Sequence, residues 1–345
     1  MTALVLASLA VAVLVASYVG VDAIWRYAKL RMLDIPGDRS SHEKPTPRGG
    51  GLALTVAHLG GVAALVGFGL LESRLASTLL LGGAAIAVVG FVDDHRHVNA
   101  FHRLAVHALA IGWSVSSVVG ESTIDFGWGP VSIGAIAGAV LVLALVWFLN
   151  LFNFMDGIDG IAGAQAAFMA LAGSAAAFVG GADATDTWPM VLLAAAAAGF
   201  LAWNWPPAKI FMGDVGSGYV GFALGVMAIW TVLQGWLTVW VWVILGGAFV
   251  ADASTTLAVR AIARQRLTEA HRSHAYQRLS RYWKGHKPVT LVVLVINVGW
   301  LGPWALVAAR WPDTAVACTV ISVAPLFAVA LKLGAGRPGE IGQRT

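Results

Sequence analysis

Two adjacent carboxylates, Asp93 and Asp94, are the first residues of this sequence whose type and placement could do chemistry. They follow a long apolar run directly. A carboxylate at the edge of an apolar segment is costly to keep charged unless it meets water, a cation or a basic partner. A solvated helix end is the simpler reading of an isolated Asp-Asp pair, so other carboxylates decide its meaning.

Further oxygen-bearing side chains follow at Asn150, Asn153 and Asp156, which recur at every third position. On a helix this spacing places them along one slowly drifting face, and Gly157 and Gly160 loosen the backbone beyond it. Oxygen ligands suit a hard cation such as Mg²⁺, which keeps several waters and is completed by substrate phosphates. Helix capping alone would account for only one or two of these residues.

A glycine-rich stretch from Phe211 to Gly218 adds another carboxylate, Asp214, and the hydroxyl of Ser217. Its GxxGxG spacing is also found in dinucleotide-binding loops, but that fingerprint requires a preceding strand and a βαβ unit. Here the stretch opens an apolar run. We therefore interpret it as a carboxylate and a hydroxyl on a backbone whose N–H groups can approach a phosphate.

Two histidines, His271 and His274, lie three residues apart in the longest basic connection. Zinc is not expected there, because no Cys and no third obvious ligand accompanies them. With Arg272 and Arg278 nearby, contact with a phosphate or a sugar is the better interpretation. A solvated amphipathic helix is the alternative.

The elements that must position these residues are membrane helices. Of the 345 residues, 58% are hydrophobic and 12% are charged, and the mean hydropathy is +0.77, so lipid must be the main solvent. Runs of about twenty apolar residues can each cross a bilayer as a helix, and we predict about eleven of them. The predicted ranges are 2–25, 50–71, 75–92, 103–120, 130–149, 161–180, 188–205, 211–230, 236–258, 289–309 and 314–332.

Lys and Arg fall almost entirely on one alternating set of connections, while the other set holds only Arg74 and Arg310 and is mildly acidic. Because basic connections stay in the cytoplasm, the N-terminus is predicted to lie outside and the C-terminus inside. The polar stretches described above all fall on the basic side. We therefore expect an all-α integral membrane protein, one polytopic domain over residues 1–345, with its active site on the cytoplasmic face.

The motifs occur in a fixed order: Asp34 to His42, Pro47 to Gly50, Asp93-Asp94, Asn150 to Gly160, Phe211 to Ser217, and the histidine stretch. On these residues the chain resembles the polyprenyl-phosphate N-acetylhexosamine-1-phosphate transferases of glycosyltransferase family 4. That family includes the phospho-MurNAc-pentapeptide translocases and the initiators of O-antigen synthesis. The resemblance covers nearly the whole chain.

The resemblance implies that undecaprenyl phosphate attacks the β-phosphorus of a UDP-HexNAc in the bacterial inner membrane and releases UMP. It implies catalytic roles for Asp93, Asp94 and Asp156, and Mg²⁺, or Mn²⁺, bound by Asp214 and Asn153. The candidate substrate-binding residues are Lys44, Arg48, Arg103, Asn150, His271, Arg272, His274 and Arg278. No nucleic-acid partner is expected, and a homodimer would be unsurprising.

One departure narrows the branch. Peptidoglycan-type translocases share a His-His-x-Glu stretch where this chain reads His271-Arg-Ser-His274-Ala-Tyr-Gln. This favours the initiators of O-antigen or capsule, which use UDP-GlcNAc or UDP-linked N-acetylated 6-deoxyhexoses. The donor, the pathway, the oligomeric state and the role of Asp93 as base or positioning group stay open.

Two alternatives remain: phospho-MurNAc-pentapeptide transfer in peptidoglycan synthesis and, in another class, a lipid or solute transporter. Transporters place ionisable groups at mid-membrane, whereas Asp252, which falls within the predicted span 236–258, lies toward the inner end of that span.

Overall fold

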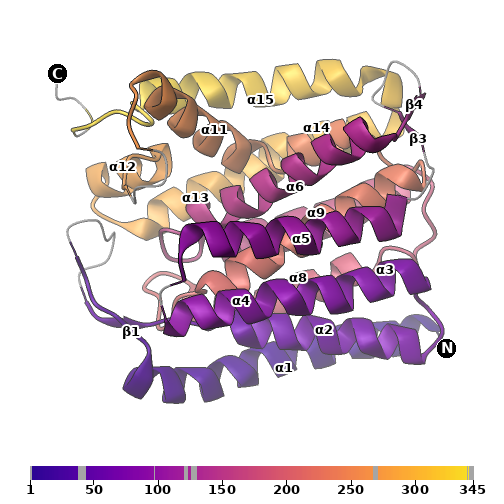
Figure 1. The fold of residues 1–345 in the computed structure, drawn as a ribbon, viewed down its shortest axis with the longest axis horizontal. Coiled ribbons are helices and arrows are strands. Elements are labelled where there is room, and N and C mark those ends of the chain that lie inside the picture. The colour runs from indigo at the N-terminus through magenta and orange to yellow at the C-terminus, as the bar shows by residue number, and fades with distance from the viewer. Residues whose placement is uncertain are drawn as a thin grey trace.

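The computed structural model describes residues 2–37, 44–96, 98–119, 123–125, 130–266, 271–339 and 341. Positions 38–42 of the first motif therefore lie outside the described residues. The described chain is a bundle of helices that lie lengthwise side by side (Figure 1). The helices are α1 (Thr2–Arg31), α2 (Gly51–Gly67), α3 (Ser73–Ser77), α4 (Gly83–His95), α5 (Ala100–Val119), α6 (Ala135–Met155), α7 (Ile161–Val179), α8 (Trp188–Asn204), α9 (Asp214–Leu233), α10 (Val239–Leu245), α11 (Gly247–Ile262), α12 (Ala275–Tyr282), α13 (His286–Ile296), α14 (Gly302–Arg310) and α15 (Ala315–Lys332).

Short elements interrupt or connect these helices. One π-helical turn, η1 (Thr78–Gly82), joins α3 to α4, and another, η2 (Asn297–Leu301), joins α13 to α14. A 3₁₀ turn, η3 (Pro312–Thr314), precedes α15. Two antiparallel strand pairs complete the described elements: β1 (Leu33–Asp34) with β2 (Thr46–Pro47), and β3 (Thr123–Asp125) with β4 (Pro130–Ser132).

Helices overlap every predicted span, so the expectation of an all-α integral membrane fold is confirmed. Among the described residues, 7 helical segments are long and apolar enough to cross a membrane, and the bent pair α10–α11 would make 8. The α10–α11 axis turns by 82° at Gly246. Because α2 and α8 have only 17 residues each, the predicted number of about eleven spans and their orientation stay predictions.

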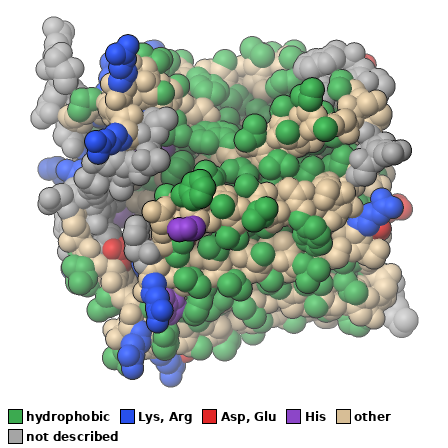
Figure 2. Space-filling model, in the orientation of Figure 1, with side chains coloured by type: hydrophobic (Ala, Val, Ile, Leu, Met, Phe, Trp, Pro, Cys, Tyr) green, Lys and Arg blue, Asp and Glu red, His purple; other side chains and the backbone are tan. Residues whose placement is uncertain are grey.

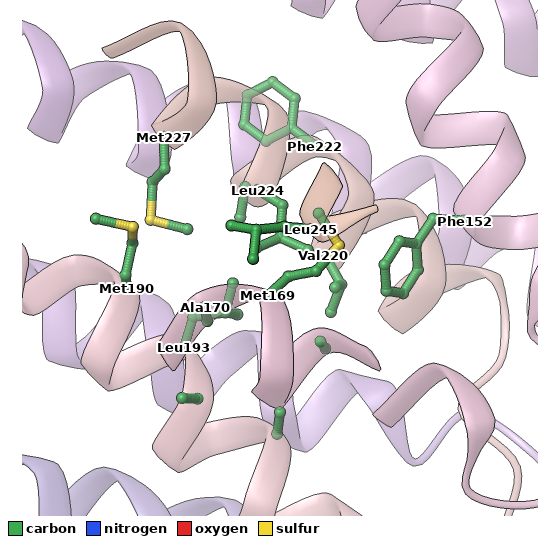
Figure 3. Close-up of a cluster of buried hydrophobic side chains, with 14 of the residues drawn as sticks. Phe152, Met169, Ala170, Met190, Leu193, Val220, Phe222, Leu224, Met227 and Leu245 are labelled. Atoms are coloured by element: carbon green, nitrogen blue, oxygen red, sulfur yellow. The ribbon is translucent and has the colours of Figure 1, made fainter. Parts of the chain in front are cut away.

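Helix α9 forms the centre of the bundle, where α2, α4, α6 and α7 pack around it. Figure 3 shows Phe152 of α6, Met169 of α7, Met190 of α8 and Leu245 of α10 gathered beside α9. Glycines permit the close approach, since a Cβ at Gly90 of α4 would lie 2.6 Å from the Asp214 carbonyl oxygen. Small residues at crossings are the usual means of packing helices in lipid, where hydrophobicity alone does not drive association.

The two ends of the bundle differ in charge. The start of α1 and the end of α15 lie at opposite ends of the bundle (Figure 1). On the face shown in Figure 2, most Lys and Arg side chains lie at the end that holds β1 and α12, and the long sides are mainly hydrophobic. The arrangement agrees with the charge asymmetry from which the orientation is predicted.

Candidate active site

A cavity of about 280 Å³ opens at the basic end, where α4 and α6 end and α9 and α13 begin. Five carboxylates lie in its wall, together with one arginine, one histidine and three carboxamides. The lining residues are Asp34, Arg48, Asp94, Asn153, Asp156, Gly157, Ile158, Asp159, Asn204, Phe211, Gly213, Asp214, Ser217, Gln277 and His286. Motifs separated by long stretches of sequence therefore meet at one place.

Asp94 caps the N-terminus of α9. Its Oδ1 accepts from the Asp214 N–H at 3.0 Å and its Oδ2 from the Val215 N–H at 3.1 Å. Gly213 must be a glycine for this contact, because its φ is +77° and a Cβ there would lie 2.6 Å from Asp94 Oδ2. A carboxylate in this position satisfies free helix N–H groups and meets the positive end of the helix dipole.

Arg48 is attached to the same residue. Its Nη2 donates to the Asp94 carbonyl oxygen at 2.7 Å, and its Nε lies 3.9 Å from Asp94 Oδ1. The guanidinium is thereby held in the cavity wall, and its contact with an anionic substrate stays a prediction.

Arg103 forms ion pairs with both Asp93 and Asp214. Its Nη1 donates to the Asp93 carboxylate and, at 3.0 Å, to Asp214 Oδ2. Asp93 also accepts from the Val98 N–H at 2.7 Å. On the other side, Asn153 Nδ2 donates to Asp214 Oδ1 at 2.7 Å. Both oxygens of Asp214 thus have partners, and its carboxylate is fixed in position.

Asp156 is different, because its side chain has no hydrogen bond or ion pair with the residues that the structure describes. It follows the last turn of α6 and lines the cavity. Burial raises the pKa of Asp156 well above its usual range, and the charges of Asp214, Asp94 and Asp159 raise this pKa further. The cavity therefore disfavours an ionised Asp156 unless a cation offsets its charge.

Asp159 and His286 form a pair that the sequence analysis did not single out. Asp159 Oδ1 lies 3.0 Å from His286 Nδ1, and Asp159 Oδ2 accepts from the Ala208 N–H at 3.0 Å. Asn204 was missed as well; its Oδ1 accepts from the Gly160 N–H at 2.9 Å. The available signal was weak: each is a polar residue at the end of an apolar run, far in sequence from its partner.

The histidine stretch is anchored from α11. Asp252 accepts from the N–H groups of Ala275 at 2.9 Å and Tyr276 at 2.8 Å, and its Oδ1 lies 3.2 Å from His274 Nδ1. The His271 ring stacks on His274 with centroids 5.0 Å apart. Burial, followed by the charges of His274 and Arg260, lowers the pKa of His271 to about 4. His271 is therefore neutral near pH 7 in the protein without substrate.

The structure brings only part of the predicted site together. Asp94, Asp156, Asp214, Asn153 and Arg48 line the cavity, and Asp93 and Arg103 contact Asp214 or its partners. The other predicted residues are not in the cavity wall: Lys44 and Arg272 are exposed, His271 and His274 pack on each other, Asn150 donates to the Val146 carbonyl oxygen, and Arg278 donates to backbone carbonyls near the C-terminus.

The oxygen-bearing side chains of the cavity are the candidate ligands for the predicted divalent cation. Among the described residues, no group of three or more His, Cys, Asp or Glu could hold a metal. Mg²⁺ needs fewer, because it keeps several waters and is usually bound by one or two carboxylates plus substrate phosphates. The unpartnered Asp156 and the fixed Asp214 fit that pattern. Asn153 Nδ2 donates to Asp214 Oδ1 and orients that carboxylate, while the predicted role of Asn153 as a metal ligand stays a prediction.

Comparison with known proteins gives consistent matches. Residues 76–232 match the family model "Glycosyl transferase family 4". The chain is 26% identical over 276 residues to the probable undecaprenyl-phosphate N-acetylglucosaminyl 1-phosphate transferase of Bacillus subtilis, covering 78% of this chain and 75% of that one. It is 29% identical over 317 residues to the decaprenyl-phosphate N-acetylglucosaminephosphotransferase of Mycobacterium tuberculosis, covering 82% and 76%. It is 30% identical over 241 residues to the phospho-N-acetylmuramoyl-pentapeptide-transferase of Shouchella clausii, covering 63% and 70%.

Proposed function

The chain belongs to glycosyl transferase family 4, and on that premise we propose that it transfers a HexNAc-1-phosphate from a UDP-sugar to undecaprenyl phosphate. The relatives from Bacillus subtilis and Mycobacterium tuberculosis are named for a prenyl phosphate and an N-acetylglucosamine phosphate. We further propose that the donor sugar is GlcNAc or an N-acetylated 6-deoxyhexose and that the step initiates O-antigen or capsule synthesis in the bacterial inner membrane.

The observation that carries the proposal is the cavity that surrounds Asp156. An unpartnered carboxylate lies there among Asp94, Asp159 and Asp214, at the end of an apolar bundle. A diphosphate could not enter such a site without a cation, and phosphoryl transfer depends mainly on positioning and charge neutralisation. The apolar bundle suits the prenyl chain, while the polar cavity suits the diphosphate.

In the proposed reaction, an oxygen of undecaprenyl phosphate forms a bond to the β-phosphorus of the UDP-sugar. The bond from this phosphorus to the bridging oxygen breaks, and its electron pair leaves with UMP. The second ionisation of a phosphate monoester lies near ~6, so the nucleophile is already largely a dianion at neutral pH. Asp93 is therefore not required as a base; its contact with Arg103 turns that guanidinium toward Asp214.

Arg48 is held beside Asp94, where it can contact a substrate phosphate. Asp156 and Asp214 are the residues that would hold Mg²⁺, or Mn²⁺, which when bound supplies positive charge to the diphosphate and to the leaving UMP. Asn153 keeps Asp214 oriented.

The transporter alternative needs an ionisable group at mid-membrane, and Asp252 is the carboxylate that the sequence analysis considered for it. In the structure both of its oxygens accept backbone N–H groups of α12. A carboxylate bound in this way caps a helix, which favours the transferase.

The proposal is tested with purified protein in lipid nanodiscs, undecaprenyl phosphate, Mg²⁺ and a panel of donors, with UMP release as the readout. We expect release from UDP-GlcNAc or an N-acetylated UDP-6-deoxyhexose, and only when the prenyl phosphate is present. Release from UDP-MurNAc-pentapeptide alone would replace the proposed branch with the peptidoglycan one. Absence of UMP with every donor would contradict the transferase.

A further inference from the structure

Arg278 is a buried arginine that the proposed reaction does not use. It is 4% exposed, and its Nε donates to the Leu333 carbonyl oxygen at 2.8 Å. Its Nη1 donates to the carbonyl oxygens of Arg337 at 3.0 Å and Gly339 at 2.6 Å. A buried guanidinium is costly unless its donors are satisfied. Here the described acceptors all belong to one short segment, so the contact ties that segment to α12.

This segment, residues 333–339, follows α15, and we name it the C-terminal strap. Its glycines permit the path, because Gly336 has φ +77° and a Cβ there would lie 2.6 Å from the Thr256 carbonyl oxygen of α11. Between Gly334 and Gly336, Ala335 is 1% exposed and packs with Ala275 of α12. The strap is thus fitted closely against both α11 and α12.

The strap also holds the histidine stretch, because the Gly336 N–H donates to the Ser273 carbonyl oxygen at 2.9 Å. Tyr276 and Arg278 are two residues apart on α12, so they point about 200° apart around the helix. On the side opposite Arg278, Tyr276 OH donates to the Phe154 carbonyl oxygen at 3.0 Å. Helix α12 is therefore held between the strap and the end of α6.

Gln277, between those two residues, lines the cavity. Its Oε1 accepts from the His274 N–H at 3.4 Å, whereas its Nε2 has no acceptor among the described residues. The nitrogens of Asn153 and Asn204, the other carboxamides of the wall, donate to Asp214 Oδ1 and to the Ile210 carbonyl oxygen. The Gln277 amide is thus a donor presented to a ligand, and α12 sets its position.

We propose that the C-terminal strap, through Arg278 and Gly336, positions α12 so that Gln277 contacts the UDP-sugar. The inference rests on the proposed function and assigns it a positioning element outside the cavity. The UDP-sugar is the substrate concerned because α12 lies in the polar connection between α11 and α13, outside the spanning helices. A water-soluble donor arrives from that side, whereas the prenyl phosphate arrives from the bilayer.

The test compares Arg278→Met, Arg278→Lys and Gly336→Ala with a matched control, Arg337→Gln, whose side chain is exposed. For each variant, KM for the UDP-sugar and KM for undecaprenyl phosphate are measured separately by UMP release. We expect Arg278→Met and Gly336→Ala to raise the donor KM about tenfold and to leave the prenyl-phosphate KM within about twofold. Arg278→Lys, which keeps a charged donor, should fall between wild type and Arg278→Met, and the control should match wild type.

A second measurement does not depend on turnover. Hydrogen exchange of the α12 amides without substrate should be faster in Arg278→Met and Gly336→Ala than in the control. Equal increases in both KM values, an unchanged donor KM, or unchanged exchange would each overturn the inference. If the wild-type protein releases no UMP, the proposed function fails, and the exchange result still decides whether the strap positions α12. Gly336→Ala carries the test if Arg278→Met does not fold.

Discussion

At the scale of single residues, the Asp93-Asp94 pair shows that neighbours in sequence can have separate tasks. Asp94 is bound to backbone N–H groups of α9, and Asp93 is bound to Arg103. Asp156 has no acidic neighbour in the sequence. Its carboxylate has no hydrogen bond or ion pair with the described residues. A carboxylate that the protein does not satisfy is the one available to a ligand.

We therefore predict opposite effects for two substitutions of Asp by Asn. Asp156→Asn should lower kcat at least about a hundredfold, because it removes charge from the proposed cation site. Its thermal stability should hold or rise near neutral pH, because a carboxyl with a raised pKa destabilises the fold once it ionises. The rate of UMP release measures the effect on kcat, and the unfolding midpoint measures the effect on stability.

Asp94→Asn serves as the contrast, since it replaces an acceptor of two N–H groups and should cost about 1–3 kcal/mol of stability. A lower unfolding midpoint for Asp156→Asn than for Asp94→Asn would contradict the assignment of these roles.

His271 carries a pH prediction. Its folded pKa of about 4 lies below its ordinary value of 6.5, so the unfolded state binds more protons between those values. Stability from this histidine is complete above about pH 6.5 and is lost as the pH falls toward about 4. Hydrogen exchange over residues 271–278 should therefore speed up on acidification. In His271→Gln the part of this acceleration of hydrogen exchange that is due to His271 should disappear. A pH profile of exchange identical to that of the wild type would contradict the prediction.

At the scale of elements, hydropathy was sufficient to place the helices, because a spanning segment must be long, apolar and internally hydrogen-bonded. The motifs also located the carboxylates of the cavity. Hydropathy could not place the 82° bend at Gly246, since the run from 236 to 258 reads as one continuous span. Nor could it reveal the Asp159–His286 pair, which depends on how α13 packs.

Arg278 illustrates the same limit from the other side. Its neighbours in sequence suggested a substrate contact, and its surroundings in the fold are backbone carbonyls of residues 333, 337 and 339. Sequence gives the charge of a side chain but not the depth at which the chain will bury it. From sequence alone, a basic residue on a polar helix is therefore easily taken for a substrate-binding residue, and only the tertiary packing shows whether it is buried.

Gly157 is the position where α12 meets the end of α6, and it gives a prediction for the element scale. A Cβ at this position would overlap Tyr276 Oη, so Gly157→Ala must displace the Tyr276 side chain or α12. We expect transfer activity to fall at least about tenfold, with a lower unfolding midpoint. Gly112→Ala is the matched control, because nothing lies within 4 Å of its Cβ and Ala is favoured in a helix such as α5. Equal losses in the two variants would refute the docking role.

At the scale of the whole molecule, most Lys and Arg side chains of the face shown in Figure 2 lie at one end of the bundle, whose long sides are mainly hydrophobic. The core around α9 is built from apolar side chains of several helices, and the Asp94 carboxylate that caps α9 is satisfied by backbone N–H groups and lies beside Arg48. The bundle should therefore stand without any ion in the cavity, whereas the proposed transfer should not proceed without one.

Chelation separates these two properties. Excess EDTA should abolish UMP release, and Mg²⁺ should restore it. The unfolding midpoint without substrate should change by no more than about 2 °C on chelation, because Arg103 and Arg48 already offset part of the carboxylate charge. Full transfer in EDTA would remove the cation from the proposal, and a large fall in the midpoint would assign it a structural role instead.

The contact of Arg103 with Asp214 has a consequence for how a cation enters the cavity. Because the guanidinium already lies 3.0 Å from Asp214 Oδ2, an incoming ion does not meet a bare anionic site. The ion would have to displace the Arg103 guanidinium, which the covalent chain keeps close to Asp214. Binding of the proposed cation at Asp214 would therefore compete with Arg103. A substrate phosphate that drew Arg103 away from Asp214 would strengthen cation binding, so binding of the ion and binding of the substrate would be coupled.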